Sequence, residues 1–145
     1  MTRAKDPDNF KYPYIWEDDA IEIFFMPSPK KSQATVQLII NAAGTITDLC
    51  RNSKSFSKIK KGEYNSGMVC KTGRDGNGWC LEMAIPITNL TIDGIAPDPK
   101  TWRANFCRDR NVGASGKLLI QRSSWSATLS NAWNVPSRFG FLHFQ

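Results

Sequence analysis

Alternation of apolar and polar side chains is the sequence feature that most constrains the fold of this chain. Residues 20–25 (AIEIFF) and 34–41 (ATVQLIIN) place every second residue on one apolar face, whereas helical spacing is nearly absent. A period of two residues is typical of a β-strand with one buried face. Residues that favour turns (Gly, Pro and Asn) separate such segments along the chain. We therefore predict an all-β protein.

The alternating segments are short and follow one another closely, which favours an antiparallel β-sandwich or jelly roll. The length of 145 residues fits one domain, and no internal repeat or linker is visible. Pro86 to Leu90 is the only segment that suits a helical turn. The predicted strands cover residues 20–25, 34–41, 45–47, 68–71, 79–85, 101–108, 117–125 and 138–144.

A tight hairpin is predicted where Asp75 and Gly76 interrupt the pattern between two strands. With Asp75 at the centre of a three-residue loop, Cys70 and Cys80 fall opposite each other. Two readings stay open for this pair, a disulfide or two free thiols packed as small apolar groups. The chain has four cysteines but no Cys-x-x-Cys pair, and its one histidine is His143, which disfavours a zinc site.

The formal net charge of +6 would suit a nucleic acid or an acidic polysaccharide. However, the basic residues are scattered, and we interpret the densest run, residues 54–61 (KSFSKIKK), as a solvated loop. Nucleic-acid binding is therefore disfavoured. No apolar stretch approaches the roughly 20 residues of a membrane span, and no signal peptide precedes the first predicted strand.

Groups that could catalyse a reaction are few. His143 lies in an alternating strand, and no Gly-x-Ser-x-Gly motif accompanies it, so a serine triad is not expected. The enzyme alternative is a glycoside hydrolase that uses Glu22 and Glu82, whose carboxyl groups would have to lie about 5–9.5 Å apart. We predict a protein without catalytic activity of its own.

Tryptophans outside the predicted core indicate binding instead. The chain has five tryptophans, and two of them, Trp16 and Trp133, lie in polar segments. A sugar ring has apolar C–H faces and a hydroxyl-rich edge, so its site combines flat aromatic rings with amides and carboxylates. Glu22, Gln37 and Asn131 supply such groups. We assign the remaining tryptophans to packing within strands: Trp79, Trp102 and Trp125.

An ordered set of segments resembles the family 9 carbohydrate-binding modules. The segment WEDDAIEIF (residues 16–24) is similar to the family's W-E-x-D-x-V-E-I-F motif. The resemblance extends from about Tyr12 to Phe144, and its order and spacing are specific. Its further segments are QLIIN (37–41), GWCLEMAIP (78–86), WRANFCR (102–108), SWS (124–126) and WNVPSRFG (133–140).

This resemblance implies a DOMON-like β-sandwich that binds carbohydrate and is attached to xylanases or other glycoside hydrolases acting on plant polysaccharides such as xylan and cellulose. It implies a secreted or periplasmic location. In the family two tryptophans clamp a terminal sugar, and these resemble Trp16 and Trp133. The family's sugar-binding glutamate corresponds to Glu22, and its asparagine lies near Asn131. The family's binding arginine corresponds to Ile39, so this chain departs from the family pattern at that position.

The resemblance also implies secondary features. Asn105 and Arg108 match recurrent family positions and are added to the candidate binding residues. Structural calcium is implied near Asp18 or Asp19, and no other cofactor is required. Some DOMON-like relatives hold haem through Met and His, which leaves a haem alternative at Met26 and His143.

The family's first strands precede its tryptophan motif, whereas only 15 residues precede Trp16 here. We therefore expect an incomplete sandwich with unpaired sheet edges. Self-association, or a partner segment that completes the sheet, follows as an expectation.

Overall fold

The computed structural model describes residues 15–51, 64–113, 117 and 119–145, and strands dominate this part of the chain. The basic run at 54–61 and residues 1–14 lie outside it. The strands are β1 (Ala20–Met26), β2 (Thr35–Asn41), β3 (Ile46–Arg51), β4 (Val69–Arg74), β5 (Trp79–Ala84), β6 (Thr101–Asn111), β7 (Ile120–Ser124) and β8 (Gly140–His143). Short 3₁₀ turns are η1 (Ile15–Glu17), η2 (Ile87–Leu90) and η3 (Pro136–Arg138).

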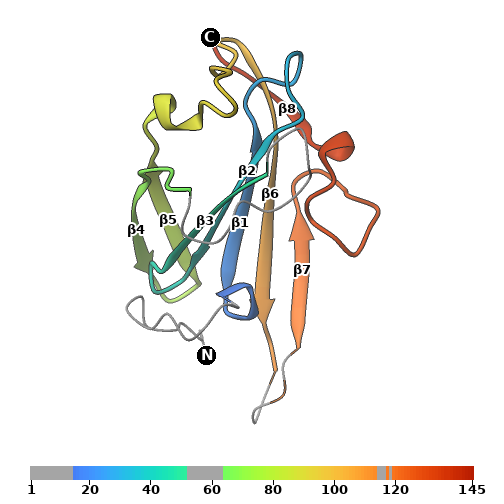
Figure 1. Cartoon of the computed structure of the whole chain (residues 1–145). Helices are drawn as coiled ribbons and strands as arrows, with labels where there is room; N and C mark the ends of the chain where they lie inside the picture. Colours follow the sequence, from blue (N-terminus) through green and yellow to red (C-terminus); the bar gives the residue numbers. More distant parts are fainter. Residues whose placement is uncertain (1–14, 52–63, 114–116, 118) are drawn as a thin grey trace.

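Six strands form one antiparallel sheet with the order β3-β2-β1-β6-β7, and β8 also pairs with β6. Strand β6 is long enough to serve two partners on one edge. Its first half, from Thr101 to Ala104, pairs with β8, and its second half, from Cys107 to Asn111, pairs with β7. The hairpin of β4 and β5 is a separate two-stranded sheet. Figure 1 shows this hairpin on one side of the view and the connection from β7 to β8 on the other.

The two faces of the larger sheet differ in character. We call the face that carries Glu22, Phe24 and Met26 of β1 the front face, and the face that carries Ile21 and Ile23 the back face. The hairpin packs on the back face and completes the main apolar core. Core side chains from the larger sheet are Ile23, Phe25, Val36, Leu38, Ile40, Cys50, Trp102 and Ala104, and Cys70 and Leu81 of the hairpin pack against them.

The β-sandwich prediction is confirmed, and the predicted strands recur with shifted ends. The expected helical turn appears as η2. Of the tryptophans assigned to packing, Trp102 is buried in the core. Trp125 follows the last residue of β7 and packs on the sheet against the Phe106 ring, although it stays 54% exposed.

The predicted hairpin register was wrong. Arg74 pairs with Trp79, which leaves four residues in the turn instead of three. The Asp75 carboxylate stabilises this longer loop by accepting hydrogen bonds from the backbone N–H groups of Asn77 and Gly78, each at 2.8 Å. As a result Cys70 faces Met83 and Cys80 faces Gly73, and both cysteines are free thiols.

Among the described strands, none pairs with the outer edge of β4 or of β5. Val69 on β4 is 70% exposed and Met83 on β5 is 36% exposed, so apolar side chains of the hairpin face solvent. The predicted segment that completes this sheet stays a prediction.

Candidate functional site

Both loop tryptophans lie against the front face. Trp16 in η1 packs on the cluster that contains Ile39, and Trp133 packs on the cluster that contains Cys107. Ile39 on β2 and Cys107 on β6 are the two cross-strand neighbours of Glu22 on β1. Each indole therefore packs against a cluster that contains one neighbour of Glu22, and both remain half-buried rather than sealed in the core.

Glu22 and Asp109 form a buried carboxyl pair at the floor of this face. Their exposed fractions are 5% and 1%. Glu22 accepts a hydrogen bond from Gln37 Nε2 at 2.7 Å. Burial raises the pKa of Glu22 to about 8, with a further rise from its hydrogen bond to Asp109 and from the Asp109 charge, while Gln37 and Arg122 act in the opposite direction. With its pKa raised to about 8, Glu22 keeps a proton near neutral pH, and it can share this proton with Asp109.

Asp109 links this pair to the second tryptophan. Arg122 on β7 donates from Nε to Asp109 Oδ1 at 3.2 Å, and its guanidinium lies 5.8 Å from the centre of the Trp133 ring. Burial raises the pKa of Asp109, and the nearby indole N–H of Trp133 offsets part of that rise. The Nε1–H group of Trp133 and the Oδ2 atom of Asp109 nevertheless form no hydrogen bond with full geometry. Each of these atoms can therefore still bond to another group.

Arg51 fastens the loop of Trp133 to the sheet. The guanidinium of Arg51, at the end of β3, donates from Nε and Nη1 to the side-chain oxygen of Asn134 at 3.1 and 2.9 Å. This orientation of the amide is the one that a guanidinium, which has only donors, requires. Burial lowers the pKa of Arg51 and the charge of Glu22 raises it. The Arg51–Asn134 contact thus joins β3 to the Trp133 loop, and the same guanidinium interacts with the charge of Glu22.

The other predicted binding residues are placed differently. Asn105 is fully buried and exchanges two hydrogen bonds with the backbone of Ser126, which fixes the start of the loop beneath Trp133. Asn131 is exposed in that loop, and Gln37 keeps a buried amide oxygen without a partner. Arg108 pairs with Ile21 in register, so it lies exposed on the back face, away from the others.

Sequence reasoning missed four front-face groups: Arg51, Asp109, Arg122 and Asn134. The signal for Asp109 was the alternation of β6, because Asp109 is two residues beyond Cys107 and shares its face. Arg108, one residue earlier, lies on the opposite face because successive side chains alternate along a strand, and its role in binding stays a prediction.

The structure does not assemble the proposed hydrolase pair. Glu82 is exposed on β5 opposite Lys71, and the apolar core under the back face separates that hairpin from the front face of Glu22. The acidic side chain that acts on Glu22 is Asp109 on the same face, and both carboxyl groups are buried rather than open to a substrate and water.

The metal and haem alternatives find no support in the contacts of their residues. Asp18 accepts from the Asn41 amide at 3.0 Å and Asp19 accepts from the Asn111 backbone at 2.8 Å. Across the described residues, no group of three or more His, Cys, Asp or Glu side chains is arranged to hold a metal ion, so calcium stays a prediction. Met26 is buried among its neighbours, which keeps its sulfur from a haem face.

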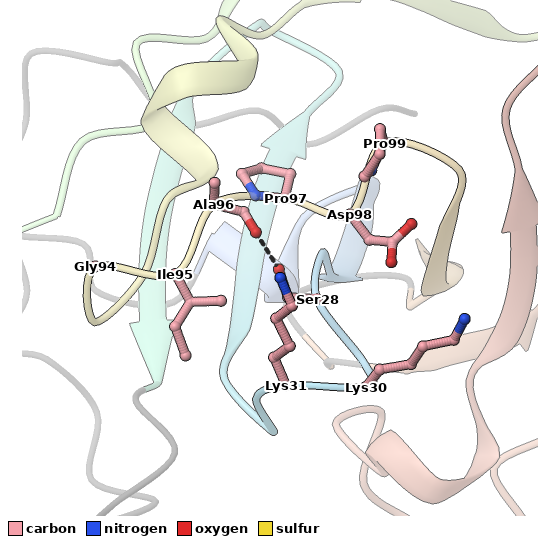
Figure 2. Close-up of a pocket in the computed structure, with 9 residues that line it drawn as sticks. All are labelled: Ser28, Lys30, Lys31, Gly94, Ile95, Ala96, Pro97, Asp98 and Pro99. Atoms are coloured by element: carbon pink, nitrogen blue, oxygen red, sulfur yellow. Dashed lines mark hydrogen bonds between the residues drawn. The ribbon is translucent and has the colours of Figure 1, made fainter.

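A separate hollow of about 280 Å³ lies between the β1–β2 loop and residues 94–99 (Figure 2). Ser28 donates to the Ala96 carbonyl at 2.6 Å and joins the two loops beneath it. Lys30 and Lys31 stand at its rim with Asp98. None of its lining residues belongs to the front-face cluster, so we do not assign it to the tryptophan site.

Residues 2–145 match the sequence profile of the family described as carbohydrate family 9 binding domain-like. The chain belongs to this family. Membership confirms the predicted family and supports carbohydrate binding without catalysis. A crystal structure of a proposed carbohydrate-binding protein from Bacteroides uniformis has the same fold, with a TM-score of 0.68 at 21% identity. The match covers 90% of this chain and 62% of that one.

No curated protein matches the family 9 chain at a significant level. In the described part of the chain, no helix has the length and apolar character needed to cross a bilayer.

Proposed function

We propose that the chain binds a sugar ring between Trp16 and Trp133 on the front face. The observation that carries this proposal is that two half-buried indoles pack against the two clusters that contain the cross-strand neighbours of Glu22. Aromatic rings bind the C–H faces of a pyranose, while the polar groups between them meet its hydroxyls. The hydroxyl partners are Glu22, Gln37, Asp109 and Arg122 at the floor and Asn131 on the loop.

Unused hydrogen-bonding capacity supports this assignment. Gln37 Oε1, Asp109 Oδ2 and Trp133 Nε1 are buried atoms without a full partner. Buried polar atoms are normally paired, and each unpaired one costs about 1–3 kcal/mol. Hydroxyl groups of a bound sugar both donate and accept, so one ligand class satisfies all three atoms.

Isothermal titration with gluco- and xylo-oligosaccharides tests the proposal on three forms of the protein: wild type, Trp133→Ala and Trp79→Phe. Loss of a stacking indole in a real site should weaken binding by on the order of 2 kcal/mol. Trp79 lies on the hairpin, so its variant is the matched control and should bind as wild type does. Equal affinity of Trp133→Ala and wild type would contradict the clamp.

We further propose that the module serves a polysaccharide-degrading glycoside hydrolase that acts on plant polymers outside the cytoplasm. The family 9 resemblance supports this context. Retention on insoluble xylan or cellulose, compared between wild type and Trp133→Ala, measures the polymer preference. Binding to neither polymer would contradict the plant-polysaccharide part of the proposal. The oligosaccharide titration would still test sugar binding between the two tryptophans.

The exposed hairpin supports a proposal about assembly, in which a second copy or another segment pairs with the two-stranded sheet. Unpaired strands attract further strands, and Val69 is 70% exposed there. Light scattering over a concentration series should show association that Val69→Lys reduces. A monomer at every concentration, with low binding of an apolar dye, would contradict it.

A further inference from the structure

On the back face, the second half of β6 and strand β7 carry a row of exposed side chains. Arg108 and Arg110 of β6 are exposed there, and their partners in register on β7, Ser123 and Gln121, are exposed or nearly so. These four residues together with Arg122 line a shallow hollow of about 410 Å³. Four of the lining residues lie on the back face, whereas Arg122 reaches the hollow from the edge strand β7 and also contacts Asp109 on the front face.

The charge on this surface is not neutralised within the described residues. The one ion pair described in this region joins Arg122 to Asp109, whose carboxylate lies on the front face. Arg108 and Arg110 therefore present two guanidinium groups of the same sign, in a chain whose net charge is +6. Guanidinium binds carboxylate in a two-point geometry that other cations do not match. The surface is thus complementary to an anion.

An exposed indole continues the same row. Trp125 follows Ser123 by two residues and is 54% exposed. It packs edge-on against the Phe106 ring, with the ring centroids 5.7 Å apart. A Cβ atom at residue 140 would lie 2.5 Å from the indole, so only glycine at that position allows this placement of Trp125. The ring is therefore held in place with much of its area open to solvent, as a stacking surface for a sugar requires.

We infer that this surface is a second binding site, which takes an anionic polysaccharide with uronate groups. We call it the back-face strip; its residues are Arg108, Arg110, Gln121, Ser123 and Trp125. Carboxylates of the polymer bind the two arginines, hydroxyls bind Gln121 and Ser123, and one sugar ring stacks on Trp125. The strip does not depend on the front-face site.

The small number of free charges favours a polyuronate over a nucleic acid. Arg108 and Arg110 are the two exposed arginines of this row, and they lie two residues apart on one strand. Duplex DNA carries a charge every 1.7 Å or so and is typically met by roughly 6–10 phosphate contacts. Two free arginines beside one indole are too few for such a backbone.

The test is binding to polygalacturonate, measured by affinity electrophoresis and by titration, with neutral dextran as the comparison polymer. The double variant Arg108→Gln/Arg110→Gln should bind at least about tenfold more weakly, and wild-type binding should weaken as salt rises. The matched control is Lys30→Gln/Lys31→Gln, which removes the same charge from an exposed loop elsewhere and should change affinity less than about twofold.

Four outcomes would overturn the inference. Unchanged binding of polygalacturonate by the arginine variant, or equal binding of dextran and polygalacturonate by the wild type, would show that the strip does not recognise the uronate carboxylates. Loss of polygalacturonate binding in Trp133→Ala would assign the polymer to the front face instead. Tighter binding of single-stranded DNA, lost in the same arginine variant, would identify a nucleic-acid surface. If the Trp133→Ala variant still binds polygalacturonate but no longer binds neutral oligosaccharides, this result would support two independent sites.

Discussion

The front and back faces of the larger sheet both bury apolar side chains, but they differ in the polar groups that they bury. Under the hairpin, the back face buries apolar residues such as Leu38 and Ile40 completely. The front face buries Glu22, Asp109 and Asn105 with almost as little exposure. Apolar burial stabilises a fold at about 25 cal/mol per Å², whereas buried carboxyl groups cost stability unless they are paired. Apolar burial therefore stabilises both faces, whereas the front face also carries buried polar groups whose cost the proposed sugar ligand would offset.

The largest effect that separates the two faces is expected for Leu38→Ala. Leu38 is fully buried in the main core, and a cavity there should lower the free energy of unfolding by about 2–5 kcal/mol. Affinity for oligosaccharides should stay the same at a temperature where the variant is folded. Urea denaturation and titration measure the two quantities. A large loss of affinity without loss of stability would break the division between the faces.

The carboxyl pair should give the front face a dependence on pH that the back face lacks. Because burial raises the pKa of Glu22 from 4.5 to about 8, the folded state holds a proton that the unfolded state has released between these values. Stability should therefore fall as pH rises from 4.5 towards 8. Glu22→Gln carries no titrating proton and should flatten this fall. Urea denaturation at several pH values checks the slope; a steeper fall in the variant would contradict the shared proton.

A smaller effect is expected where Arg51 fastens the Trp133 loop. Arg51→Gln removes the paired hydrogen bonds to Asn134, and a hydrogen bond to a charged group is worth about 1.5–3 kcal/mol at most. We expect several-fold weaker sugar binding and faster amide exchange in the loop, with little change in the back-face core. Arg74→Gln, an exposed arginine on the hairpin, is the control. Unchanged exchange at Trp133 would show that Arg51 does not hold the loop.

The sequence predicted most of the strands because alternation is a local signal that depends on burial of one face. The register of the β4–β5 hairpin depends on the length of its turn, which alternation alone does not reveal. The Asp75 side chain stabilises a four-residue turn, and in the resulting register Cys70 does not face Cys80. Trp16, Glu22 and Trp133 were predicted from composition and resemblance. Asp109 was missed because its neighbour Arg108 was preferred, and a single step along a strand exchanges the two faces.

The central claim is that Trp16 and Trp133, rather than the other tryptophans, contact the sugar. The chain has five indole N–H groups, and each gives its own NMR signal, so a titration with an oligosaccharide observes them together. We predict that the signals of Trp16 and Trp133 move with one binding curve while those of Trp79, Trp102 and Trp125 stay in place. Movement of Trp125 alone, or of no indole while calorimetry reports binding, would contradict the front-face site.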